Sequence, residues 1–174
     1  TFKTAAVSIA TNESYKRIAI ERGGMKPENV YVVRSGPKLD RLKIIDPVPA
    51  LKKGRQYMVG YVGVMGKQEG IDYLLRAAKH IIHEQQRTDI HFGFVGGGTE
   101  LEQLKNYAAE LDVADYVTFT GRVPDQDLLE MLNTADICVN PDVANEMNDK
   151  STMNKIMEYM ALAKPIVQFD LTEG

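Results

Sequence analysis

Residues 57–82 read YMVGYVGVMGKQEGIDYLLRAAKHII, and this stretch indicates how most of the chain folds. It opens with a short apolar run, Tyr57 to Gly63, of the kind that forms a buried strand, and a glycine-containing loop follows. Apolar residues then recur at the spacing of a helix with one buried face, at Ile71, Leu74, Leu75, Ala78, Ile81 and Ile82. A strand, a loop and an amphipathic helix in this order predict one βα unit of a parallel sheet.

The same alternation continues to the end of the chain. Further strands are expected at Ile90 to Gly96, Tyr116 to Thr120, Ile137 to Asn140 and Pro165 to Phe169. A second amphipathic helix is expected from the spacing of Leu101, Leu104, Ala108 and Leu111. The pattern predicts an α/β fold, a Rossmann-like open parallel sheet with helices on both faces.

A shorter α/β segment precedes this domain. We expect a strand at Val7 to Ile9, a helix from Asn12 to Arg22 that ends at Gly23-Gly24, and a strand at Val30 to Val33. Residues 36–54 are interrupted by proline and glycine, show no helical period, and are typical of a linker. Residues 1–52 are therefore interpreted as the end of one domain with its linker, and residues 53–174 as a Rossmann-like domain.

Composition excludes several classes of protein. The 174 residues are 44% hydrophobic and 26% charged, which suits a globular domain and not a disordered chain. A formal charge of −3 gives no overall attraction to nucleic acid. The single cysteine, Cys138, excludes a disulfide framework within the chain, and the three histidines are too scattered to predict a metal site. No apolar stretch is long enough to span a bilayer.

Two phosphate-binding motifs are only partly present. A P-loop ending at Gly66-Lys67 needs glycine five positions before Gly66 and serine or threonine after the lysine, but Tyr61 and Gln68 stand there. The run Gly96 to Gly98 resembles a dinucleotide fingerprint, but its third glycine position holds Leu101. A dinucleotide-using enzyme of this fold is therefore disfavoured.

The loop glycines Gly63, Gly66 and Gly96 to Gly98 still allow two interpretations. Glycine after a strand lets the backbone approach a ligand, and the amides of the following helix start favour an anion. The alternative is that these glycines only form tight turns between strand and helix.

The segment at residues 145–167, NEMNDKSTMNKIMEYMALAKPIV, contains a predicted helix with two different sides. One side carries Met153, Ile156, Met157, Met160 and Lys164, and the other carries Ser151, Lys155 and Glu158. Ser151 and Thr152 at the helix start, with Lys155 one turn on, suit a diphosphate, and Glu158 suits a ribose diol. The alternative is an ordinary solvated helix face with a cap and a Lys155/Glu158 pair.

Four segments in this order resemble one known family: YVGVMGKQEGIDYLLRAA, FGFVGGGTELEQL, VTFTGRVPDQDLLEMLNTADICVNP and NKIMEYMALAKPIV. They are similar to the nucleotide-binding C-terminal half of group 1 (family four) retaining glycosyltransferases with the GT-B fold. The likeness covers about residues 53 to 174. The earlier ATNESYKRIAIERGGMKPENVYVVRSGP is similar to the end of the acceptor domain and the linker.

The resemblance implies transfer of a hexosyl group, with retention, from a nucleotide diphosphate sugar, UDP-sugar favoured over GDP-sugar, without metal or other cofactor. It implies a role in polysaccharide or glycoconjugate biosynthesis in the cytoplasm, with peripheral membrane association through a further domain left open. The chain starts without methionine and stops directly after an apparent strand, so we interpret it as a fragment. The N-terminal domain with the acceptor site and a C-terminal helix would then be missing, and the fragment alone would be inactive.

The residues expected to bind the donor follow from the same resemblance. Glu158 would bind the ribose hydroxyls, the backbone around Arg122 and Val123 the base, and Lys67 and Lys155 would stabilise charge on the leaving diphosphate. The full set is Gly63, Gly66, Lys67, Gly96, Gly97, Arg122, Val123, Asp149, Lys150, Ser151, Thr152, Asn154, Lys155 and Glu158.

The chain also departs from the family at three positions. Val64 and Glu69 stand where the family usually places an arginine and a lysine, and Lys150 replaces the first motif glutamate. Asp149 or Glu146 is expected to take over the contact to the sugar, or Lys150 to meet the phosphates. These departures leave a second hypothesis open, a noncatalytic regulatory or assembly module of the same fold.

Overall fold

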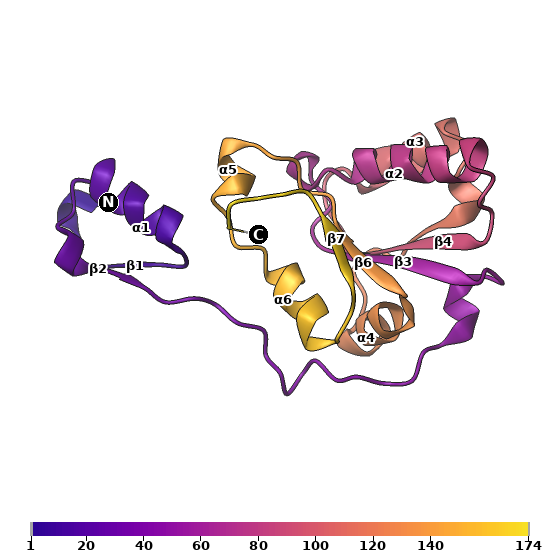
Figure 1. Ribbon diagram of the computed structural model, residues 1–174, viewed down its shortest axis with the longest axis horizontal. Helices are drawn as coiled ribbons and strands as arrows, with labels where there is room; N and C mark the ends of the chain where they lie inside the picture. Colours follow the sequence, from indigo (N-terminus) through magenta and orange to yellow (C-terminus); the bar gives the residue numbers. More distant parts are fainter. Residues whose placement is uncertain (1, 174) are drawn as a thin grey trace. The chain divides into compact units, whose positions relative to one another are not determined.

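The computed structural model describes residues 2–173, which divide into two compact units (Figure 1). Unit 1 comprises the residues up to Pro37, Ala144–Asn154 and the residues from Asp170 onward. Unit 2 comprises Lys38–Val143 and Lys155–Phe169 and contains the predicted sheet.

The sheet of unit 2 has five strands, as the sequence predicts, and their bounds agree closely with the expected ones. They are β3 (Tyr57–Val62), β4 (Ile90–Val95), β5 (Val117–Phe119), β6 (Ile137–Asn140) and β7 (Ile166–Gln168). The strand order is β5-β4-β3-β6-β7, and every neighbouring pair is parallel. The carboxyl ends of all five strands therefore lie along one edge of the sheet.

Helices cover both faces of this sheet, which confirms the predicted fold class (Figure 1). One face carries α2 (Ile71–Lys79) with its continuation η5 (His80–Glu84), and α3 (Leu101–Glu110). The other face carries α4 (Asp125–Thr134) and α6 (Asn154–Ala161). Short 3-10 turns complete the unit at η3 (Pro49–Lys52), η4 (Lys67–Glu69) and η6 (Ala114–Tyr116).

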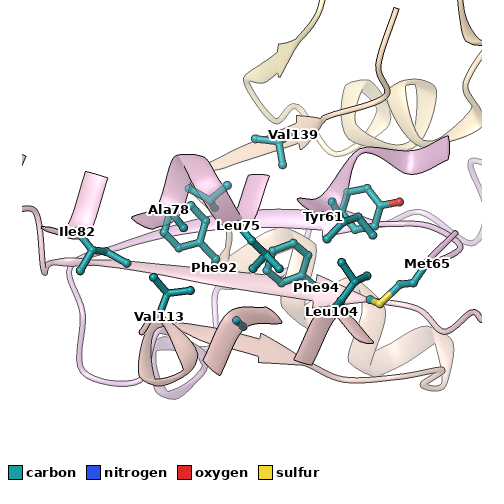
Figure 2. Close-up of a cluster of buried hydrophobic side chains, with 13 residues drawn as sticks. Tyr61, Met65, Leu75, Ala78, Ile82, Phe92, Phe94, Leu104, Val113 and Val139 are labelled. Atoms are coloured by element: carbon teal, nitrogen blue, oxygen red, sulfur yellow. The ribbon is translucent and has the colours of Figure 1, made fainter. Parts of the chain in front are cut away.

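The main core lies between the sheet and the pair α2 and α3 (Figure 2). Phe92 and Phe94 of β4 are fully buried there, and the Phe94 ring stacks on Phe119 with 4.7 Å between ring centroids. The predicted apolar faces supply the helical side of this core, through Ile71, Leu75, Ala78 and Ile82, and through Leu104 and Ala108. Burying these side chains provides most of the driving force that holds the layers together.

The part of the predicted linker that belongs to unit 2 is fastened to α4. The Asn133 side chain accepts a hydrogen bond from the Ile45 amide at 3.2 Å and donates one to the Lys43 carbonyl at 3.1 Å. The Thr134 hydroxyl accepts a bond from the Val48 amide at 2.8 Å. Buried polar side chains thus fix an otherwise irregular segment on the helix surface.

Unit 1 contains the short α/β segment expected at the start of the chain. Strand β1 (Ser8–Ala10) pairs in parallel with β2 (Val30–Val32), and α1 (Glu13–Glu21) connects them. The side chain of Asn12 caps α1 by accepting a bond from the Tyr15 amide at 2.8 Å. Two 3-10 turns, η1 (Phe2–Thr4) and η2 (Pro27–Asn29), and the short helix α5 (Glu146–Asp149) complete the unit.

His91 on β4 makes unit 2 sensitive to acid. Its ring is buried, Nε2 lies 2.9 Å from the Thr118 hydroxyl, and Nδ1 has no partner among the described residues. Burial, helped by the nearby positive charges of Arg55 and Lys53, lowers the pKa of His91 from 6.5 to about 4. Between these two values the unfolded chain binds a proton that the folded chain excludes, so stability is lost as the pH falls.

We therefore expect the free energy of unfolding to fall by about 2 kcal/mol between pH 7 and pH 4.5 because of His91. Urea denaturation at both pH values measures this difference, and His91→Val should remove most of it. His80→Gln, a change at an exposed histidine, is the matched control. An unchanged pH dependence in His91→Val would contradict the assignment.

Candidate functional site

The carboxyl edge of the sheet has one point at which the chain connections diverge. The chain runs from β3 to β4 and β5 on one side, and from β6 to β7 on the other. Strands β3 and β6 pair only at Val59 with Ile137 and at Gly60 with Cys138. Open α/β sheets bind ligands in the crevice beyond such a switch point.

Tyr159 of α6 occupies the place where β3 and β6 separate. Its hydroxyl accepts a hydrogen bond from the Val62 amide at 2.9 Å and donates one to the Val139 carbonyl at 3.2 Å. The side chain thus replaces the missing ladder bonds between the two strands. Burial raises the pKa of Tyr159 well above its ordinary value, so the hydroxyl stays protonated.

The glycine loops after β3 and β4 pack directly against each other. The Met65 amide donates to the Gly97 carbonyl at 3.1 Å, and the Glu100 amide donates to the Met65 carbonyl at 3.0 Å. Gly96 has φ +126°, and a Cβ there would overlap the Gly63 carbonyl. Gly96 is therefore required by the approach of two loops, which favours the turn interpretation at this position.

The loop after β5 joins the same group. Gly96 donates its amide to the Gly121 carbonyl at 2.9 Å, and Gly97 faces the side chain of Arg122. The structure therefore brings four predicted residues together at one edge: Gly63, Gly96, Gly97 and Arg122. Arg122 is exposed and Val123 is half-buried, which leaves the arginine accessible to a ligand.

Gly66 and Lys67 lie beside a small polar hollow of about 260 Å³. Asp72 and Glu100 also line it. Lys67 is exposed, but two carboxylates share its surroundings, which lowers the positive potential that it offers to a phosphate. A second hollow, of about 200 Å³, lies between α2 and β7, is almost wholly apolar and contains none of the predicted site residues.

Lys155 is buried in a cluster of three charges beside the switch point. Its ammonium donates to Glu69 Oε2 at 2.7 Å and to the two oxygens of Asp142 at 3.2 and 3.1 Å. It also lies 5.0 Å from the centroid of the Tyr61 ring, whose hydroxyl donates to Glu69 Oε2 at 3.1 Å. We call Lys155, Glu69 and Asp142 the charged triad.

The two carboxylates of the charged triad differ in burial. The side chain of Asp142 is 1% exposed and that of Glu69 is 16% exposed, while Lys155 is 9% exposed. Burial, with the nearby charge of Glu69, raises the pKa of Asp142 even though Lys155 acts in the opposite direction. Burial and Glu69 also raise the pKa of Tyr61, which keeps its hydroxyl a donor.

The two sides predicted for the helix at 151–164 are wrong in part. Helix α6 begins only at Asn154, and its buried residues are Lys155, Ile156 and Tyr159, whereas Met160 is 65% exposed. Lys164, placed on the same side as the methionines, instead donates to the carbonyls of Asn133 and Ala135 at the end of α4. Spacing places a lysine on the polar side, but the structure buries Lys155 because two carboxylates neutralise it.

Glu158 lies one turn beyond the start of α6 and is half-buried. Its surroundings include Arg41 and Asp125, which form a salt bridge of 2.7 Å with each other. Burial raises the pKa of Glu158, Arg41 lowers it and Asp125 raises it. A carboxylate can accept hydrogen bonds from the two hydroxyls of a ribose.

Five other predicted residues belong to unit 1, and the side chains of four of them have hydrogen-bond partners there. Asp149 accepts bonds from the Thr172 amide at 2.9 Å and hydroxyl at 3.0 Å, which lower its pKa. The Lys150 ammonium lies 2.9 Å from Glu146, which also pairs with Arg22. The Ser151 hydroxyl donates to the Met147 carbonyl, and the Thr152 hydroxyl accepts a bond from the Asn12 side chain. Asn154 is exposed.

Three residues that the sequence did not assign to the site lie at its centre, namely Tyr61, Asp142 and Tyr159. Asp142 lies two residues after the end of β6. A polar residue just beyond a strand at a switch point is a signal of a binding site, and this signal identifies Asp142. In the sequence, Glu69 stands out only as a departure from the family pattern. Its pairing with Lys155 depends on residues 86 positions apart and has no local signal.

Within residues 2–173, no group of three or more histidine, cysteine, aspartate or glutamate side chains is arranged to hold a metal ion. Over the same residues, every helix is too short or too polar to cross a bilayer.

Comparison with known proteins identifies the family. The family model for group 1 glycosyl transferases matches residues 56–174, and the chain therefore belongs to this family. Two curated relatives are D-inositol 3-phosphate glycosyltransferases. The chain is 34% identical over 92 residues to the one from Corynebacterium jeikeium, covering 50% of the chain and 22% of the relative. It is 28% identical over 149 residues to the one from Acidothermus cellulolyticus, covering 79% of the chain and 33% of the relative.

The fold agrees with this assignment. The structure of HepE from Anabaena in complex with UDP and glucose superposes with a TM-score of 0.78 at 19% identity. The superposition covers 98% of this chain and 46% of that chain. The GT-B type of α/β fold expected from the resemblance is thereby shown, and the chain spans a third or less of the length of the two curated relatives it matches.

Proposed function

We propose that the chain binds the donor of a glycosyltransferase, a nucleotide diphosphate sugar, at the carboxyl edge of the sheet in unit 2. The observation that carries the proposal is the match of residues 56–174 to the group 1 glycosyl transferases. Supporting it, the glycine loops after β3 and β4, Arg122 and Lys155 of α6 gather at the edge where such sheets bind ligands.

The finer parts of the proposal rest on the family resemblance. The donor is a UDP-sugar in preference to a GDP-sugar, the hexosyl group is transferred with retention, and the reaction needs no metal. Residues 53–174 act as the C-terminal donor domain, and a further N-terminal domain supplies the acceptor site. The whole protein then works in the cytoplasm, in polysaccharide or glycoconjugate biosynthesis, and the chain alone is inactive.

Calorimetric titration of the chain with UDP, GDP, ADP and NAD at one fixed salt concentration tests the proposal. We expect selective binding of one nucleoside diphosphate, UDP first. Glu158→Ala should lower the affinity for UDP by about tenfold or more, because the variant lacks a carboxylate that accepts hydrogen bonds from the ribose. The same change should lower the affinity for 2′-deoxy-UDP much less, since this ligand lacks one of the two hydroxyls that would bind Glu158.

Glu110→Ala, at the exposed end of α3, is the matched control for loss of one surface carboxylate. An equal loss of affinity for UDP and 2′-deoxy-UDP in Glu158→Ala would argue against a ribose contact. Binding of NAD in preference to all the diphosphates would instead support the dinucleotide-using enzyme.

One observation favours a second candidate function, a noncatalytic regulatory or assembly module of the same fold. Lys155 is expected to stabilise charge on the leaving diphosphate, yet it is buried against Glu69 and Asp142. A cation neutralised in this way offers a phosphate little attraction. Sugar transfer from a nucleotide donor by the intact protein would end this alternative.

A further inference from the structure

The hydrogen-bonding capacity of Lys155 is already used within the protein. An ammonium group has three N–H donors. In the charged triad it faces one oxygen of Glu69 and both oxygens of Asp142, and the Tyr61 ring lies on a further side. An incoming anion can therefore reach Lys155 only if one of these carboxylates gives way.

Glu69 is the carboxylate that can give way. It is the more exposed of the two, and it ends η4 in a loop that Gly66 and Gly70 flank. Asp142 is fully buried and lies next to Pro141, whose carbonyl is in close contact with Gly70. Glu69 can rotate towards solvent at the cost of its bonds from Lys155 and Tyr61, whereas the side chain of Asp142 has almost no exposed surface.

The charge of the triad also opposes the binding of an anion. By formal charge, one ammonium and two carboxylates leave the charged triad with one net negative charge. An anion that approaches Lys155 is therefore repelled, and removal of one carboxylate charge brings the triad to neutrality.

We propose that Glu69 is a built-in competitor that occupies Lys155 and sets the affinity of the site for phosphate groups. The inference rests on the proposed function, because it concerns the same nucleotide site. Phosphate binds tightly only when the Glu69 carboxylate has left Lys155. The residue acts as a specificity determinant through Lys155, and it does not itself need to contact the ligand.

Titration calorimetry with Glu69→Gln tests this inference, with inorganic pyrophosphate and UDP as separate probes. Glutamine keeps the size of the side chain and its contact with Tyr61 but removes the charge. We expect the variant to bind pyrophosphate at least tenfold more tightly than the original chain. Glu84→Gln, which removes one exposed carboxylate at the end of η5, should leave the affinity unchanged.

The outcomes separate the inference from the proposed function. Affinity for pyrophosphate that is unchanged or weaker in Glu69→Gln, or that rises equally in Glu84→Gln, overturns the inference. Tighter pyrophosphate binding without binding of any nucleoside diphosphate supports the inference and contradicts the proposed function. If circular dichroism shows that Glu69→Gln does not fold, Glu69→Ala replaces it. Tighter pyrophosphate binding by Glu69→Ala is then expected, and unchanged or weaker binding overturns the inference.

Discussion

Lys155→Met is expected to lower the free energy of unfolding by about 3 to 5 kcal/mol, because it leaves the buried Asp142 carboxylate and the largely enclosed Glu69 carboxylate without their cation. Methionine nearly preserves the volume of the lysine stem, so the loss reports charge and not packing. Asp142 is 1% exposed and already has a raised pKa, so it cannot regain full hydration in the folded chain. Urea denaturation at pH 7 measures the difference.

Two further variants show whether the effect arises from the charged triad. Lys105→Met removes an exposed lysine that pairs with Glu102 on α3, and it should change stability by less than about 1 kcal/mol. Adding Asp142→Asn to Lys155→Met should restore part of the loss, since one of the two uncompensated charges is removed. Equal costs for the two lysine substitutions would show that the triad contributes little to stability.

The fold could be predicted from the sequence because its signals are local. Each strand of unit 2 is a short apolar run between turn residues, as in Ile137 to Asn140, and each helix repeats an apolar spacing, as from Ile71 to Ile82. The division of the chain into domains, with its boundary near residue 52, stays a prediction. The structure groups residues 144–154 with the N-terminal segment by contacts that no local pattern encodes.

The charged triad could not be predicted because its energy depends on distant partners. Helical spacing predicts that a lysine follows the polar side of a helix, and for Lys155 this expectation is wrong. A charged side chain can be buried where side chains of opposite charge pair with it. For Lys155 these partners, Glu69 and Asp142, lie on two other loops. The donor-binding roles of Lys67, Arg122 and Glu158 stay predictions until nucleotide binding is measured.

The loop geometry that brings the two carboxylates together depends on Gly70. This residue has φ +64°, and a Cβ there would overlap the backbone carbonyl of Pro141. Glu69 precedes Gly70 in the chain and Asp142 follows Pro141, so the close backbone contact sets the carboxylates side by side around Lys155. Any side chain at position 70 forces the two loops apart.

We therefore expect Gly70→Ala to cost about 3 kcal/mol or more, the sum of an unfavourable backbone conformation and a backbone clash. Gly121→Ala is the matched control, because Gly121 has φ +68° but no atom within 4 Å of its Cβ position. The control carries the conformational cost alone, about 1 kcal/mol. Urea denaturation of both variants isolates the contact with Pro141, and equal costs would contradict its importance. If the contact also assembles the triad, Lys155→Met should cost less in the Gly70→Ala background than in the original chain.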